Sequence, residues 1–311
     1  MSRHDLSVTI CGVLLKNPFV LASGILGTGA ALLARVARAG AGAVTAKSYG
    51  PEPRAGHPNP TVLDWGGGLI NAVGLPNPGV EVGVRELLET KERLRPLGVP
   101  LIASLFADTA KGYGEVARAI AQAGPDLLEI NISCPNVEDE FGQPFAADPR
   151  AAAQVTLEVK RATKLPAIVK LSPNVADIKA IARAVEQAGA DAISAINTLG
   201  PGMVIDIEAG RPILAHRVGG ISGPAIRPIA VRCVYDICSA VSIPVIGIGG
   251  VLRGRDAVEM IMAGASAVGI GSAVYYHGLG VFKRLEAELS TYMEAHGYAR
   301  LEDFRGVAHE G

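Results

Sequence analysis

Cysteine and aromatic residues are scarce in this sequence. Only four of the 311 residues are cysteine (Cys11, Cys134, Cys233 and Cys238), and 5% are aromatic. No two cysteines form a C-x-x-C pair, so we expect neither an iron–sulfur cluster nor a structural zinc in this chain, and no other metal site. So few cysteines are typical of a reducing compartment, in which disulfides are rare.

An excess of positive charge is also missing. The formal net charge is -1, and there is no basic tail or arginine-rich stripe. Binding to nucleic acid therefore lacks its electrostatic basis. No signal peptide precedes the first strand-like segment, and no apolar run is long enough to span a bilayer. We expect a soluble, cytoplasmic protein that binds neither nucleic acid nor a membrane.

What the sequence does contain is a repeated alternation of short hydrophobic runs with helical segments. The hydrophobic fraction is 49%, which is ample for a large core. The runs show little alternation of apolar and polar residues, as in parallel strands buried on both faces. A count of eight favours a (β/α)8 (TIM) barrel over an open doubly wound sheet. The predicted strands are 18–24, 43–48, 101–106, 127–133, 167–172, 192–198, 244–250 and 267–273.

Other segments complete this single predicted α/β domain, 1–311. Residues 6–16 alternate around Cys11-Gly12 and predict an N-terminal β-hairpin. Long loops follow strand two (49–79), strand four (including 138–145, a candidate lid) and strand six (199–224). Loops of this length in a compact domain are usually functional.

The carboxyl ends of the strands are where a barrel of this kind places its site. Strand four ends in Asn131-Ile132-Ser133-Cys134-Pro135-Asn136. Pro135 restricts Cys134 to extended geometry, so a thiol stands at a strand end. The alternative is a small apolar cysteine that only packs. For Cys233 and Cys238, in a helical stretch, we favour packing.

Two lysines, Lys47 and Lys170, end strands two and five. Lysine is rarely buried without a partner. An anionic ligand or the pyrimidine edge of a flavin would provide one; a neighbouring carboxylate is the alternative.

Glycine-rich ends follow strands seven and eight, at Gly249-Gly250 and Gly271-Ser272. Barrels often bind phosphate there through backbone N–H groups, which glycine allows to come close. The turn at Gly27–Ala30 looks superficially like a dinucleotide motif but lacks the acidic residue that would bind the ribose.

Four amide side chains, those of Asn71, Asn77, Asn131 and Asn197, fall in loops or at strand ends. Any one of them is more often part of a turn than of a binding site. Together with a thiol and two lysines they indicate recognition of a flat ring that carries carbonyls, N–H groups and a carboxylate.

Taken together, these stretches resemble the dihydroorotate dehydrogenase family over nearly the whole chain. The matching segments are 71–75, 129–136, 169–174, 196–198, 219–225 and 248–251. The resemblance implies an FMN cofactor on the barrel top and oxidation of (S)-dihydroorotate to orotate in pyrimidine synthesis. It implies that Cys134 takes the C5 proton while hydride passes from C6 to flavin N5. A thiol suits this role because its ordinary pKa, about 8.5, is close to neutrality.

The resemblance also implies the remaining site residues. Those at the substrate would be Lys47, Asn71, Ala72, Val73, Gly74, Leu75, Asn131, Asn197 and Thr198. Those at the cofactor would be Ser23, Lys47, Ser48, Ser104, Asn131, Lys170, Ile196, Gly223, Gly249, Gly250, Gly271 and Ser272.

Within the family, the segment Phe141–Phe145 with Asp148-Pro149 is most similar to class 1B, the NAD-linked branch. That branch implies a homodimer that works with a partner subunit carrying FAD and a 2Fe–2S cluster, as a heterotetramer. Ser104 departs from the Asn expected there. A fumarate-dependent class 1A enzyme stays open. So do another FMN barrel acting on pyrimidines, a barrel using Lys47 or Lys170 for Schiff-base chemistry, and a non-catalytic scaffold.

Overall fold

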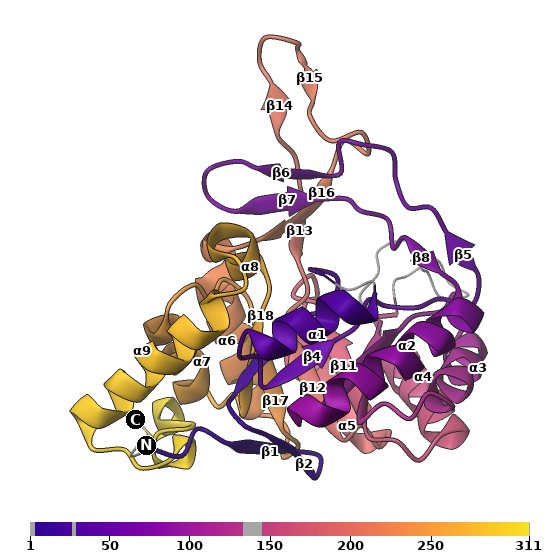
Figure 1. Ribbon diagram of the computed structural model, residues 1–311. Coiled ribbons are helices and arrows are strands. Elements are labelled where there is room, and N and C mark those ends of the chain that lie inside the picture. Colours follow the sequence, from indigo (N-terminus) through magenta and orange to yellow (C-terminus); the bar gives the residue numbers. More distant parts are fainter. Residues whose placement is uncertain (1–3, 27–28, 133–144, 311) are drawn as a thin grey trace.

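The computed structural model describes residues 4–26, 29–132 and 145–310. Its centre is a closed barrel of eight parallel strands in the order β10-β11-β12-β17-β18-β3-β4-β9, which confirms the predicted (β/α)8 architecture (Figure 1). The strands are β3 Phe19–Leu21, β4 Ala43–Thr45, β9 Leu101–Leu105, β10 Leu127–Asn131, β11 Ala167–Leu171, β12 Ala192–Ala195, β17 Val245–Ile248 and β18 Ala267–Ile270. Every residue of β9, β10 and β11 is buried, as their uninterrupted hydrophobicity predicts.

Helices surround the barrel, and three of them, α3, α4 and α5, begin at a Thr or Asp whose side chain caps the first turn. The Thr109 hydroxyl accepts a hydrogen bond from Gly112 N at 3.0 Å, and the Asp148 carboxylate accepts one from Arg150 N at 2.9 Å. Pro149 occupies the first helical position after Asp148, where no N–H is needed. The helices are α1 Ala30–Arg38, α2 Val80–Leu94, α3 Ala110–Ala121, α4 Pro149–Ala162, α5 Ile178–Gln187, α6 Arg227–Cys238, α7 Gly254–Met262, α8 Ser272–His277 and α9 Val281–His296.

The amino end of the barrel is closed by the predicted hairpin, β1 (Val8–Ile10) and β2 (Val13–Leu15). Its two turn residues, Cys11 and Gly12, have φ of 51° and 80°, as in a type I′ turn. Cys11 Sγ donates to the carbonyl of Asp191, just before β12, at 3.3 Å. The hairpin therefore leaves the carboxyl end of the barrel as the open end.

The loops after strands two and six contain strands of their own, which the sequence did not indicate. Four of them form one antiparallel sheet, and two pairs stand beside it. The sheet runs β13 (Leu199–Gly202), β16 (Gly219–Ser222), β7 (Leu69–Asn71) and β6 (Val62–Asp64); the pairs are β14 (Ile205–Asp206) with β15 (Arg211–Pro212), and β5 (Pro53–Arg54) with β8 (Asn77–Pro78). We call β13-β16-β7-β6 the upper sheet, because it stands over the carboxyl end of the barrel (Figure 1).

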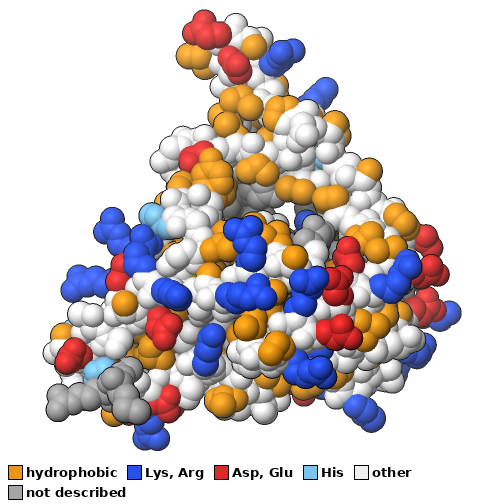
Figure 2. Space-filling view, viewed as in Figure 1, with side chains coloured by type: hydrophobic (Ala, Val, Ile, Leu, Met, Phe, Trp, Pro, Cys, Tyr) orange, Lys and Arg blue, Asp and Glu red, His pale blue; other side chains and the backbone are white. Residues whose placement is uncertain are grey.

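Figure 2 shows the molecule hollowed between the upper sheet and the barrel, with the β14–β15 arm rising above. Within the described ranges, no helix is both long and apolar enough to cross a membrane.

Candidate functional site

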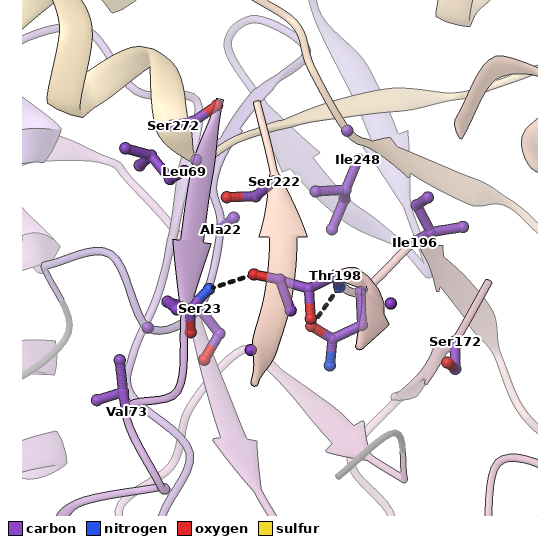
Figure 3. A pocket seen from close by; sticks show the side chains of 18 of the residues that line it. Ala22, Ser23, Leu69, Val73, Ser172, Ile196, Thr198, Ser222, Ile248 and Ser272 are labelled. Carbon is purple, nitrogen blue, oxygen red and sulfur yellow. Dashed lines mark hydrogen bonds between the residues drawn. The ribbon is translucent and has the colours of Figure 1, made fainter. Parts of the chain in front are cut away.

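A cavity of about 790 Å³ lies at the carboxyl ends of the barrel strands, under the upper sheet. In Figure 3, Ser23 and Val73 lie on one side of this cavity, Ile196 and Ile248 lie on the other, and Thr198 stands between them. The predicted site residues that line it are Ser23, Lys47, Ser48, Asn71, Ala72, Val73, Gly74, Leu75, Asn131, Lys170, Ile196, Asn197, Thr198, Gly223, Gly249, Gly250, Gly271 and Ser272.

Two predicted site residues are not among them. Cys134 and the candidate lid around 138–144 fall outside the described residues. Ser104 is fully buried behind the cavity wall, where its hydroxyl lies 2.8 Å from Ser48 Oγ and donates to Glu129 Oε1 at 3.1 Å.

The two lysines have different surroundings. Lys170 Nζ lies 3.8 Å from Glu129 Oε1, and both side chains are almost completely buried. Lys170 therefore has a neighbouring carboxylate as its partner, which was the alternative to a ligand, although its side chain also lines the cavity. Lys47 has no carboxylate partner among the described residues. Burial lowers the pKa of Lys47 below its ordinary value, and the charge of Lys170 lowers it further.

Three of the four amides contribute to the cavity wall. Asn71 Nδ2 donates to the carbonyl of Gly220 at 3.3 Å, which ties β7 to β16. Asn131 Nδ2 donates to Ser48 Oγ at 3.3 Å. Asn197 Oδ1 accepts from Thr198 N at 2.8 Å.

The fourth amide, Asn77, has a structural role. Its Oδ1 accepts from Gly50 N at 3.1 Å and Gly79 N at 2.9 Å, and its Nδ2 donates to Leu75 O at 3.0 Å. Asn77 therefore holds together the two ends of the loop that carries Asn71.

Three glycines give one end of the cavity a wall of bare backbone. Gly223, Gly249 and Gly250 have φ of 94°, 141° and 71°. A Cβ on Gly250 would stand 2.6 Å from Arg227 Cβ and 2.8 Å from Gly223 O. Only glycine fits here, and the absence of side chains lets a phosphate approach backbone N–H groups.

Two histidines in the long loops, His57 and His216, also line the cavity, and no sequence signal indicated them. Their rings stack with centroids 4.1 Å apart and planes 5° apart. His57 Nδ1 lies 3.1 Å from the carbonyl oxygen of Ala72. The pair therefore supports the 71–75 segment from outside the barrel.

Cys233 and Cys238 lie on α6 and do not line the cavity. Burial raises the pKa of the Cys233 thiol, and burial raises that of Cys238 to about 12. Both thiols are therefore poor nucleophiles, which agrees with the packing role expected for them.

The fold and the cavity define a (β/α)8 barrel with a polar ligand site at the carboxyl ends of its strands and a glycine-rich phosphate end. The profile of the family described as "Dihydroorotate dehydrogenase" matches residues 5–293. The chain belongs to this family.

The chain is similar to three named relatives over nearly its whole length, each called "Dihydroorotate dehydrogenase B (NAD(+)), catalytic subunit". The protein of Methanosarcina mazei is 48% identical over 309 residues, covering 99% of this chain and 96% of the relative. That of Methanothermobacter thermautotrophicus is 44% identical over 305 residues, covering 98% and 99%. That of Geobacter sp. is 42% identical over 308 residues, covering 99% of each.

Proposed function

We propose that this chain is the catalytic subunit of an NAD-linked dihydroorotate dehydrogenase, which oxidises (S)-dihydroorotate to orotate in pyrimidine synthesis. The observation that carries the proposal is the cavity itself. It brings the side chains of Asn71, Asn131 and Asn197 to the same space as Lys47 and Lys170. The names of relatives at 42–48% identity support it.

The cavity residues fit an FMN group. A volume of about 790 Å³ is within the usual range for a cofactor site. Among the described residues, no Asp or Glu lines the cavity, whereas two lysines do. This charge suits an anionic phosphate ester and an electron-rich pyrimidine edge. The bare backbone of Gly223, Gly249 and Gly250 suits the phosphate.

Each part of the FMN would be held by particular residues. The phosphate end would lie at Gly223, Gly249, Gly250, Gly271 and Ser272, and Lys170 would face the flavin ring. Ser23, Ser48, Asn131 and Ile196 complete the proposed cofactor set; Ser104 acts behind them. When bound, FMN supplies the hydride acceptor for the reaction.

The substrate would be held from above and below. Asn71 to Leu75 belong to the upper sheet and the loop after it, whereas Asn131, Asn197 and Thr198 come from strand ends of the barrel. Amide groups from both sides can bind the carbonyl and N–H edges of one flat ring. Lys47, which has no carboxylate partner among the described residues, is the proposed partner of the substrate carboxylate.

We propose Cys134 as the base that takes the C5 proton. Cys134 follows Asn131, the last residue of β10 and part of the cavity wall, by three positions in the sequence. A base at this point is in its working form only as the thiolate, so flavin reduction should slow as pH falls.

The test is anaerobic addition of dihydroorotate to the FMN-loaded chain while the visible flavin absorbance is followed. We expect the flavin band to bleach. Cys134→Ala should keep FMN but bleach at least about 100-fold more slowly, because a general base contributes 10²–10⁴-fold. Cys233→Ala is the matched control and should bleach at the parent rate. Unchanged bleaching in Cys134→Ala would remove Cys134 from the base role, and an unbleached parent would refute the proposed substrate.

The electrons would leave through a second protein. The relatives are named catalytic subunits, which implies a further subunit. We propose a homodimer of this chain that binds a partner carrying FAD and a 2Fe–2S cluster, with NAD⁺ as the final acceptor, in the cytoplasm.

A further inference from the structure

Among the described residues, Glu129 is the one buried carboxylate inside the barrel, and it lies beside Lys170, which lines the cavity. Glu129 is 4% exposed, and the two neighbouring serines that contact it, Ser104 and Ser194, are 0% exposed. Ser104 Oγ donates to its Oε1 and Ser194 Oγ donates to its Oε2, each at 3.1 Å. Lys170 Nζ, at 3.8 Å from Oε1, is its only cation among the described residues. An ionised carboxylate is stable at such a place only when it is paired in this way.

The hydroxyl groups beside Glu129 form a chain with one direction. A hydroxyl has a single proton, and that of Ser104 is given to Glu129. Ser104 must therefore accept from Ser48, whose Oγ lies 2.8 Å away. Ser48 in turn accepts from Asn131 Nδ2 at 3.3 Å. Because a carboxylate only accepts, Glu129 fixes the direction of every hydrogen bond up to the Asn131 amide.

We propose that Glu129 is a positioning residue, which holds the Lys170 ammonium at the cavity floor and orients the Asn131 amide through Ser104 and Ser48. This inference rests on the proposed function, because Lys170 and Asn131 are the residues assigned to the flavin and the substrate. It also gives Ser104, which does not line the cavity, a defined place in the site.

The two actions of Glu129 can be separated. Its charge offsets that of Lys170, so neutralising it leaves the floor more positive and favours the reduced, more electron-rich flavin. Its hydrogen bonds orient Asn131, so breaking the hydroxyl chain without removing the charge should disturb only the ring held by Asn131. Ser104→Ala breaks the hydroxyl chain and keeps the charge. Glu129→Gln removes the charge and also disturbs the chain, since the Gln amide can donate to Ser104 and reverse the direction of its hydrogen bonds.

Two measurements on the FMN-loaded chain test this: the flavin midpoint potential, with a chemical reductant, and the dissociation constant of orotate, from its perturbation of flavin absorbance. Glu129→Gln should favour the reduced flavin about tenfold, a rise of about 30 mV for a two-electron couple. It should also raise the dissociation constant of orotate about tenfold, which corresponds to the loss of one charge-assisted hydrogen bond. Ser104→Ala should leave the potential unchanged and weaken orotate about threefold.

Glu186→Gln is the matched control. Glu186 also accepts from a serine hydroxyl, Ser242 Oγ at 2.7 Å, but it lies on α5 and does not line the cavity. Both readouts should keep their parent values. If Glu129→Gln does not fold, Glu129→Asp is used in its place. The Asp side chain keeps the charge but is too short to hold both serines, so this variant should bind orotate more weakly without a rise in the flavin potential.

Parent values for potential and orotate affinity in Glu129→Gln would overturn the inference, as would parent orotate affinity in Ser104→Ala. Failure of the proposed function looks different, because a parent chain that does not bleach with dihydroorotate can still show the shift in potential. A parent chain that takes up no FMN would overturn both.

Discussion

Lys47 destabilises the folded, ligand-free chain and is also the proposed partner of the substrate carboxylate. It has no carboxylate partner among the described residues, and burial followed by the charge of Lys170 lowers its pKa below 10.5. Between its folded pKa and 10.5, the unfolded chain therefore binds more protons than the folded chain. The stability of the ligand-free chain should rise with pH through this window, because the folded state no longer has to keep the charge.

Lys47→Met should accordingly raise the melting temperature of the ligand-free chain near neutral pH and flatten its rise with pH. The same substitution should weaken orotate about 10- to 100-fold, the worth of a hydrogen bond to a charged group. Calorimetry and flavin-absorbance titration measure the two effects. The exposed Lys16→Met is the control and should change neither. A lower melting temperature in Lys47→Met would contradict this account.

Gly250 should be irreplaceable for two separable reasons, backbone conformation and space. Its φ is 71°, and a Cβ would collide with Arg227 and Gly223. Gly98 has a similar φ of 60° but open space around it, so Gly98→Ala bears only the conformational cost, about 1–2 kcal/mol. Gly250→Ala should lose a further ~1–3 kcal/mol from overpacking and bind FMN at least about tenfold more weakly. FMN titration of both variants tests this prediction. Equal FMN affinity of Gly250→Ala and Gly98→Ala would exclude a phosphate contact at Gly250.

Among single residues, the sequence predicted most of those that line the cavity, but not the buried residues behind them. Lys47, Asn131 and Lys170 were found because strand ends can be located from hydrophobic runs, and barrels collect strand ends at one place. Glu129 stands within such a run and indicates nothing by itself. Its role depends on Ser104, which lies opposite it on the neighbouring strand β9, and on Ser194, which reaches it from β12, two strands away in the closed barrel.

Among the elements, the upper sheet could not be predicted from local pattern. Its strands are three or four residues long, and they pair segments from two loops that are far apart in the sequence. Alternation over so few residues carries little information, so both segments were predicted only as long loops. The barrel strands and helices, by contrast, follow from hydrophobic runs, caps and glycine stops.

Gly220 of β16 packs tightly against Thr198, which follows the barrel strand β12. A Cβ there would stand 2.1 Å from Thr198 Oγ1, and Gly220 O accepts from Asn71 Nδ2. Gly220→Ala should therefore displace two proposed substrate contacts, weaken orotate about tenfold and cost ~1–3 kcal/mol. Gly280→Ala, with φ of -60° and nothing near its Cβ, is the matched control and should stay near the parent in both. Parent orotate affinity in Gly220→Ala would show that β16 does not set these contacts.

The whole chain was predicted to be one domain, and its cavity is built by both the barrel and the upper sheet. A site shared in this way couples the two parts, because a ligand bound between them stabilises both at once. The chain offers a direct probe of this coupling. Its single tryptophan, Trp65, lies at the turn between β6 and β7, where its backbone N–H donates to Gly68 O at 3.1 Å. Tryptophan fluorescence therefore follows the upper sheet, whereas far-UV circular dichroism follows mainly the helices around the barrel.

We expect the two signals to change at the same temperature, in one transition, since residues of β7 and β16 line the same cavity as residues of the barrel strands. FMN at about 100 times its dissociation constant should raise both midpoints together by about 4 °C. This value corresponds to ~2.7 kcal/mol of binding free energy, spread over the unfolding entropy of a chain of this length. Trp65→Phe removes the fluorescence signal, so its midpoint is measured by circular dichroism alone. This midpoint should equal that of the parent, which would show that the Trp65 side chain does not itself set the stability of the chain. A fluorescence midpoint well below that of the circular dichroism, unmoved by FMN, would mean that the upper sheet unfolds independently of the barrel.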